Sequence, residues 1–258
     1  MKYELSFFTG GGGGVYASKI LGHKVIGYVE IGEFQRKVIR ARIEDGIFDN
    51  APIFSDIRKF ISEGYAERYR GMVDVISGGF PCQDISSAGS GKGLNSERSG
   101  LWREYANAIR IIRPRNVFVE NSPLLSIRGL RTVLSDLAEA GYDARWGVLG
   151  SEDLGLPSSR KRLWIFAGLL RQRLEMWWER SNPEKIVRRS EVRSCKTSSD
   201  VVRKFLSGFN AGGIHGTTHG MADFKHRVIT VGNGQVPELA ARAYRILDTS
   251  LDDISSRG

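Results

Sequence analysis

The chain has 258 residues, 41% hydrophobic and 26% charged, which is the composition of a folded globular protein and excludes a disordered or fibrous one. Two cysteines cannot form a disulfide framework and suit a reducing compartment. The formal net charge of +9 favours a polyanionic partner, above all nucleic acid. The apolar stretch Leu5 to Phe8 is too short for a membrane span or a signal peptide, so we expect a cytoplasmic protein.

The first thirty residues predict a strand, a glycine turn, a helix and a second strand. Lys2 to Phe8 is the first strand, and five glycines follow at positions 10–14. A helix begins near Val15, and the second strand, His23 to Val29, ends at Glu30. In such a βαβ unit the glycines let a ligand approach the backbone, and the acid accepts hydrogen bonds from ribose hydroxyls. The turn fits the dinucleotide pattern G-x-G-x-x-A, but S-adenosylmethionine enzymes share this architecture, so both cofactor classes stay open.

A helix over Glu33 to Glu44 and a short strand over Pro52 to Ile57 come next. Asp56 suits hydrogen bonding to an adenine amino group, with Ile57 packed on the ring. It equally suits the N-cap of the segment 58–63, and the residues alone favour the cap.

The segment around Cys82 carries the strongest chemical signal. An apolar run from Val73 to Ile76 predicts a buried strand, which ends at Gly78-Gly79 before Pro81 and Cys82. Ligands of open α/β sheets bind beyond such strand ends. A lone cysteine is most often a small buried hydrophobe, but the polar residues Gln83, Asp84 and Ser86 favour a functional thiol.

The middle of the chain continues the α/β alternation. Ser86 to Gly100, rich in glycine, serine and charge, predicts a loop that covers a substrate. Leu101 to Ile112 predicts a helix that Pro114 stops, and Arg115 to Val119 predicts a strand with polar Glu120 and Asn121 at its end. The apolar face of that helix comprises Trp102, Tyr105, Ala106, Ile109 and Ile112.

A helix over Leu124 to Ala140 and strands over Tyr142 to Leu149 and Leu163 to Ala167 follow. Arg160 and Arg162 occupy alternate positions at the start of the last strand, so their side chains point the same way. A solvated strand edge is the simpler reading of this pair.

From Leu169 to about Arg227 the alternation disappears. Between Arg171 and Lys204, ten basic residues stand against five acidic ones, with tryptophans at 177 and 178. Basic residues with interleaved aromatics are typical of a nucleic-acid surface, although a solvated basic helix has the same composition. Four residues here have the chemistry of zinc ligands but match no standard spacing, so we predict no metal. They are Cys195, His215, His219 and His226.

The C-terminal part predicts a strand and turn over Val228 to Val236, then a helix from Pro237 to Asp248. Five motifs therefore occur in a set order. They are the glycine turn with Glu30, Phe80-Pro81-Cys82-Gln83, Glu120-Asn121, Arg160-x-Arg162 and Gly232-Asn233-Gly234-Gln235-Val236-Pro237.

In this order the chain resembles the DNA (cytosine-5) methyltransferases, over residues 3–168 and 227–248. The resemblance implies an α/β fold of the Rossmann-like, S-adenosylmethionine-dependent methyltransferase type, with a mostly parallel sheet and helices on both faces. It implies a catalytic domain of residues 1–168 and 227–258 and a small target-recognition segment, 169–226. That segment is short for the family, and Ser122 and Ser158 replace the usual Val and Gln.

The resemblance also implies a role for individual residues. Cys82 is the nucleophile, Glu120 binds the cytosine ring nitrogen and amino group, and Arg160 and Arg162 position them. The implied S-adenosylmethionine site comprises Phe8, Gly10, Gly12, Gly13, Glu30, Ile31, Asp56, Ile57, Pro81, Leu101, Asn233 and Val236. The implied DNA contacts are Gln83, Ser86, Arg188 and Arg189.

The expected partners are double-stranded DNA, from which the target base is flipped out, and a cognate restriction endonuclease; we expect a monomer. Three alternatives remain open. A tRNA cytosine-5 methyltransferase uses the same thiol chemistry. A catalytically silent DNA-binding regulator needs none of it. An NAD-dependent dehydrogenase is supported only by the glycine pattern.

Overall fold

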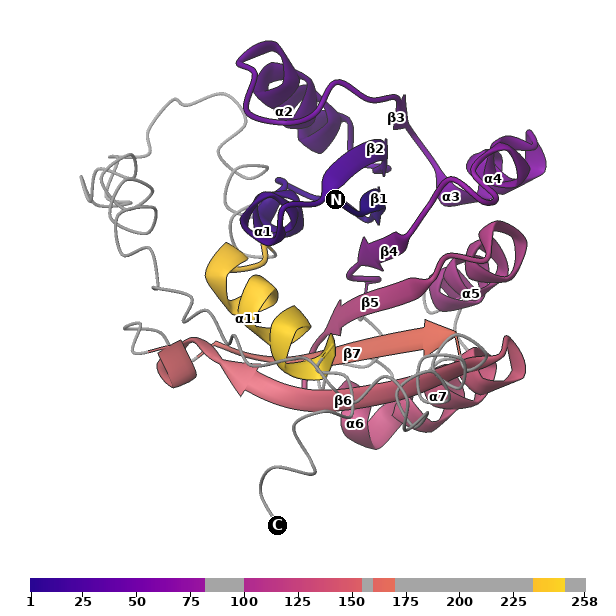
Figure 1. Cartoon of the computed structure of the whole chain (residues 1–258), viewed down its shortest axis with the longest axis vertical. Helices are drawn as coiled ribbons and strands as arrows, with labels where there is room; N and C mark the ends of the chain where they lie inside the picture. Colours follow the sequence, from indigo (N-terminus) through magenta and orange to yellow (C-terminus); the bar gives the residue numbers. More distant parts are fainter. Residues whose placement is uncertain (82–99, 155–159, 170–233, 249–258) are drawn as a thin grey trace, which may run out of the picture.

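The computed structural model describes residues 1–81, 100–154, 160–169 and 234–248 (Figure 1). Its centre is a seven-stranded sheet with the strand order β3-β2-β1-β4-β5-β7-β6. Neighbours from β3 to β5 pair in parallel, and β7 runs antiparallel to both β5 and β6. The strands are β1 (Tyr3–Phe7), β2 (Lys24–Val29), β3 (Ile53–Phe54), β4 (Val75–Gly78), β5 (Asn116–Asn121), β6 (Tyr142–Gly150) and β7 (Lys161–Leu169). The predicted mostly parallel sheet is confirmed.

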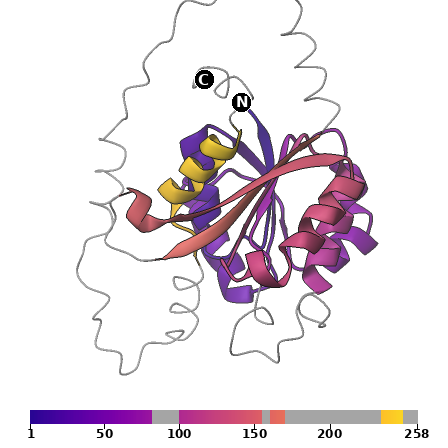
Figure 2. The ribbon, with the colours of Figure 1, turned by 90° about the horizontal axis from the view of Figure 1, so that it is seen from below.

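Helices cover both faces of the sheet, as Figure 2 shows with the sheet seen nearly edge-on. One face carries α1 (Gly13–Leu21), α2 (Glu33–Glu44) and α11 (Pro237–Asp248). The other carries α3 (Ile57–Ser62), α4 (Tyr65–Arg68), α5 (Gly100–Ile112), α6 (Leu125–Arg128) and α7 (Leu130–Glu139). A short 3₁₀ turn, η2 (Ser151–Leu154), follows β6.

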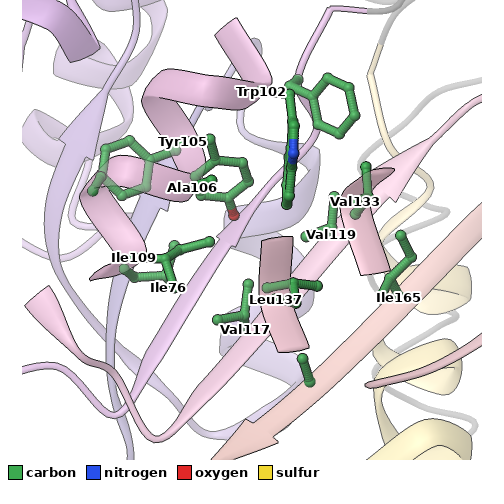
Figure 3. Packing of buried hydrophobic residues seen from close by; sticks show 14 of the residues in the cluster. Ile76, Trp102, Tyr105, Ala106, Ile109, Val117, Val119, Val133, Leu137 and Ile165 are labelled. Atoms are coloured by element: carbon green, nitrogen blue, oxygen red, sulfur yellow. The ribbon is translucent and has the colours of Figure 1, made fainter. Parts of the chain in front are cut away.

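The apolar face predicted for α5 forms the centre of the larger core. Its five predicted residues are all buried, and they pack with residues of β4, β5, β7 and α7 (Figure 3). The Trp102 indole donates a hydrogen bond to Asp136 on α7 at 2.7 Å, which satisfies the polar end of this large side chain. Core packing on this face thus covers the paired strands β4 and β5.

On the opposite face, α11 packs against α1 and against β6 and β7. The ring of Tyr244 meets those of Phe118 on β5 and Phe166 on β7 edge to face, with centroids 5.2 and 5.1 Å apart. The helix has the predicted bounds. Its docking brings Gly234 and Gln235, far along the chain, beside the glycine turn and the end of β5.

Two predicted elements were wrong in extent. The strand over Pro52 to Ile57 forms only at Ile53–Phe54, because the Asp56 carboxylate accepts a hydrogen bond from the Arg58 amide at 2.8 Å and starts α3. The helix over Leu124 to Ala140 is divided at Gly129, whose lack of a side chain weakens a helix at that point. The predicted segments 86–99, 170–226 and 228–233 lie outside the described residues.

A buried polar cluster joins β1, β4 and α1. The Glu4 carboxylate accepts a hydrogen bond from Ser18 at 2.7 Å, lies 2.7 Å from His23 Nδ1, and also accepts from Ser77. The Glu4 and His23 side chains are only 3% and 5% exposed. Polar groups so buried stabilise a fold only as a complete set.

Glu4→Ala is expected to lower the free energy of unfolding by about 3–5 kcal/mol, because it leaves His23 and two hydroxyls without their shared acceptor. Chemical denaturation measures this. Glu33→Ala is the control, because it removes an exposed pair with Lys37 and should cost less than about 1 kcal/mol. Equal losses in the two variants would mean that the cluster adds no stability.

Candidate active site

The glycine turn after β1 has a constrained backbone. Phe8 has a φ of 51°, in the left-handed region that a bulky residue rarely adopts, and Gly10 and Gly12 have φ values of 58° and 89°. A Cβ on Gly12 would also collide with the Phe48 ring. Backbone strain of this kind gathers at functional sites. The turn delivers the chain to the N-terminus of α1, where it can face a ligand.

Glu30, at the end of β2, ties this turn to the next one. Its carboxylate accepts hydrogen bonds from the Gly10 amide at 2.7 Å and from the Gly32 amide at 2.8 Å. The residue is 9% exposed. The neighbouring Ile31 is 64% exposed, an unusual state for a large apolar side chain beside a cavity.

A cavity of about 500 Å³ lies at this end of the sheet, beyond β1, β2, β4 and β5. It is lined by eight of the site residues predicted from the sequence. These are Phe8, Gly10, Gly13, Glu30, Ile31, Pro81, Glu120 and Arg162. Residues from five separate stretches of the chain thus share one space.

Other predicted site residues within the described ranges do not line this cavity: Gly12, Asp56, Ile57, Leu101, Arg160 and Val236. Asp56 caps α3, and Ile57 is 3% exposed in the core. The cap favoured by the residues alone is therefore confirmed, and contact of Asp56 with adenine stays a prediction. Cys82, Gln83, Ser86, Arg188, Arg189 and Asn233 lie outside the described residues.

Glu120 is a largely buried acid that is paired with an arginine. Arg162 Nε donates to its Oε1 at 2.7 Å, and the Glu120 side chain is only 12% exposed. Burial raises the pKa of this carboxyl, although the charges of Arg162 and Arg160 oppose the rise. A carboxyl with a raised pKa retains its proton closer to neutral pH, as an acid catalyst requires.

The two arginines at alternate positions both act on this acid. Burial, and then the charge of Arg162, lowers the pKa of Arg160, while the charge of Glu120 opposes the change. A solvated strand edge, the simpler interpretation of the pair, is therefore wrong for Arg162, which pairs with a buried carboxylate.

Asn121 fixes the chain that leads to Cys82. Its amide nitrogen donates to the Phe80 carbonyl at 3.1 Å, and its oxygen accepts from the Ser122 amide at 2.8 Å. Pro81 lines the cavity directly after this anchor. Of this Glu-Asn pair, Glu120 supplies the acid. Asn121 anchors the main chain at Phe80, two residues before Cys82.

Sequence reasoning missed Gln235. This residue lines the cavity, and its side chain hydrogen-bonds with Glu120. Its signal was a polar side chain inside the last motif, beside Asn233 and Val236, which were the only residues of that motif predicted to bind a ligand.

Within the described part of the chain, no group of three or more His, Cys, Asp or Glu side chains is placed to hold a metal ion. The Cys195, His215, His219 and His226 set lies outside it. Among the helices that the structure describes, none has the length and apolar character to cross a membrane.

Comparisons with known proteins agree with this geometry. The chain is 31% identical over 143 residues to the type II methyltransferase M.CviJI of Paramecium bursaria Chlorella virus IL3A, and 29% identical over 154 residues to M.NlaIV of Neisseria lactamica. Each match covers 55% of this chain and 36% of the relative, so the chain spans about a third of the length of these proteins.

A crystal structure of the S. pombe Dnmt2 methyltransferase has a similar fold, with a TM-score of 0.53 at 18% identity over 81% of this chain and 68% of that one. The family profile described as C-5 cytosine-specific DNA methylase matches residues 4–237. Because this match includes every element that lines the cavity except the body of α11, the chain belongs to the family of C-5 cytosine-specific DNA methylases.

Proposed function

We propose that this chain transfers a methyl group from S-adenosylmethionine to carbon 5 of cytosine in double-stranded DNA. One observation carries the proposal: the buried Glu120, paired with Arg162, opens onto the same cavity as Glu30 and the glycine turn. A carboxyl that can bind the cytosine and a site for the methyl donor therefore share one cavity.

The residues present suit S-adenosylmethionine. A volume of about 500 Å³ fits a small-molecule site. Glu30 offers carboxylate oxygens to ribose hydroxyls, and the exposed Ile31 offers an apolar surface to adenine. When bound, this donor supplies an electrophilic sulfonium methyl group.

The chain's own residues then act on the cytosine. Cys82, as a thiolate, forms a bond to carbon 6, and the electron pair of the 5,6 double bond moves to carbon 5, which becomes nucleophilic. Glu120 holds a proton at the ring nitrogen and stabilises the charge that develops there, while Arg162 keeps its carboxyl in place. After the methyl group has moved to carbon 5 and the demethylated donor has left, the carbon 5 proton passes to water. The electron pair of that bond restores the 5,6 double bond, and the thiolate leaves carbon 6.

We assign DNA recognition to the segment 169–226, in which Arg188 and Arg189 contact phosphates. Outside that segment, Gln83 and Ser86 contact the DNA near the flipped base. The basic residues and tryptophans of the segment support this assignment. We further propose that the chain acts in the cytoplasm as a monomer beside a cognate restriction endonuclease. In support, its relatives M.CviJI and M.NlaIV are type II methyltransferases.

Bisulfite sequencing of DNA from cells that express the chain tests this function. We expect protected cytosines in one short sequence context, absent from cells that express Cys82→Ala. Transfer of labelled methyl groups in vitro to duplex DNA and to tRNA is the companion assay. Labelling of tRNA alone would show that the substrate is RNA and not DNA. No labelling of either would contradict the methyltransferase function.

Glu30→Ala is expected to weaken S-adenosylmethionine binding about 10- to 100-fold, because it removes the proposed ribose acceptor and leaves the Gly10 and Gly32 amides without their partner. Isothermal titration calorimetry measures the change, and DNA affinity should fall much less. Glu33→Ala, an exposed change three residues further on, should leave both affinities unaltered. An unchanged affinity in Glu30→Ala would remove Glu30 from the donor site.

A further inference from the structure

Gln235 occupies the junction between the glycine turn and the catalytic acid. It lies two residues before α11, which packs against α1. Its main chain rests so close to Gly13 that a Cβ there would collide with the Gln235 carbonyl. The amide oxygen Oε1 lies 2.9 Å from the position that a Cβ on Gly14 would take. Gln235 can therefore lie against the first turn of α1 only because Gly13 and Gly14 have no side chains.

The other end of the same amide faces Glu120. A Cβ on Gly79 would lie 3.6 Å from Gln235 Nε2 and 2.5 Å from Glu120 Oε2, so both groups converge on Gly79. Nε2 is the only side-chain donor of a glutamine, so it makes the hydrogen bond with the Glu120 carboxyl. Arg162 holds the other oxygen, Oε1, at 2.7 Å.

Two donors from different parts of the chain thus restrain the carboxyl. Arg162 comes from β7 and Gln235 from the segment before α11, while Arg160 adds a second positive charge. A carboxyl held by one donor can still rotate about its last bond, whereas one held by two cannot. Gln235 is partly buried, and removing its amide from water is costly unless its hydrogen bond is made.

We propose that Gln235 is a positioning residue for the methyl transfer: its amide fixes the plane of the Glu120 carboxyl toward the cytosine and joins that acid to the glycine turn of the donor site. The inference rests on the proposed function. It adds a residue that touches neither the reacting carbon nor the transferred methyl group.

The experiment compares Gln235→Met and Gln235→Glu with the wild-type chain. Methionine keeps the length of the side chain and removes the donor, so kcat should fall about tenfold or more. The KM for S-adenosylmethionine should change less than about threefold, because Glu30 and the glycine backbone, the groups proposed to bind the donor, are unchanged. Arg242→Gln, an exposed change on α11, is the control and should retain the wild-type kcat.

The pH dependence separates positioning from packing. A glutamate at 235 repels Glu120 when ionised, but it donates the missing hydrogen bond once the pair shares a proton. The kcat of Gln235→Glu relative to wild type should therefore recover as the pH falls from about 8 to about 6. Gln235→Met has no proton to gain and should show no recovery.

A wild-type kcat in Gln235→Met would overturn the inference. So would a raised KM for S-adenosylmethionine with kcat unchanged, which would make Gln235 only a wall of the donor site. If Gln235→Met fails to fold, the test is the kcat of Gln235→Glu relative to wild type at low pH. If that kcat does not recover, the inference is overturned. Failure of the wild-type chain to methylate DNA would instead overturn the proposed function.

Discussion

Glu120→Gln is expected to slow methyl transfer about 100- to 1,000-fold, because an amide cannot hold a proton at the cytosine ring as a carboxyl does. The change keeps the shape of the side chain but removes the charge that pairs with Arg162 at 2.7 Å. Binding of S-adenosylmethionine should change little, since Glu30 and the glycine turn are untouched. Single-turnover rates on duplex DNA measure the effect.

The control for Glu120→Gln is Glu152→Gln. It removes an exposed ion pair with Lys161, the residue before Arg162 on β7. It should leave the rate unaltered. A rate in Glu120→Gln within about threefold of wild type would show that no carboxyl is needed at the base.

The same variant should alter the dependence of stability on pH. Because burial raises the pKa of Glu120, the folded protein keeps this proton to a higher pH than the unfolded chain. This contribution to stability is complete below the usual carboxyl pKa and is lost as the pH rises through the raised value. The free energy of unfolding, measured by chemical denaturation across this range, should decline as the pH rises in wild type. The decline should be smaller in Glu120→Gln.

Cys82→Ser is expected to abolish methyl transfer, with a loss of at least about 1,000-fold, while DNA binding stays largely intact. A hydroxyl is a far weaker nucleophile than a thiolate toward carbon 6, and without the covalent bond carbon 5 remains unreactive. Filter binding and labelled methyl transfer measure the two properties separately. Retained transfer would remove Cys82 from the nucleophile role.

A covalent trap tests the same residue directly. DNA with 5-fluorocytosine at the target has no proton to lose from carbon 5 after methylation, so the bond to the thiol persists. We expect a stable protein–DNA adduct with the wild-type chain and none with Cys82→Ser. Cys195→Ser, which changes the other cysteine of the chain, should still form the adduct.

Much of this molecule was readable from the amino-acid sequence. The βαβ opening, the buried face of α5 and the bounds of α11 follow from glycine placement, apolar periodicity and a proline at the first helical position, all of which act over a few residues. The order of motifs along the chain predicted the fold and the family, and the cavity brings eight of the predicted residues together.

Tertiary structure decided what depends on distant partners. The break at Gly129 divides a segment whose residues predicted one continuous helix. The raised pKa of Glu120 depends on burial by elements from several parts of the chain. The contact of Gln235 with both Glu120 and the first turn of α1 exists only because α11 docks beside α1, more than two hundred residues apart in sequence, and packing of that kind leaves no local signal.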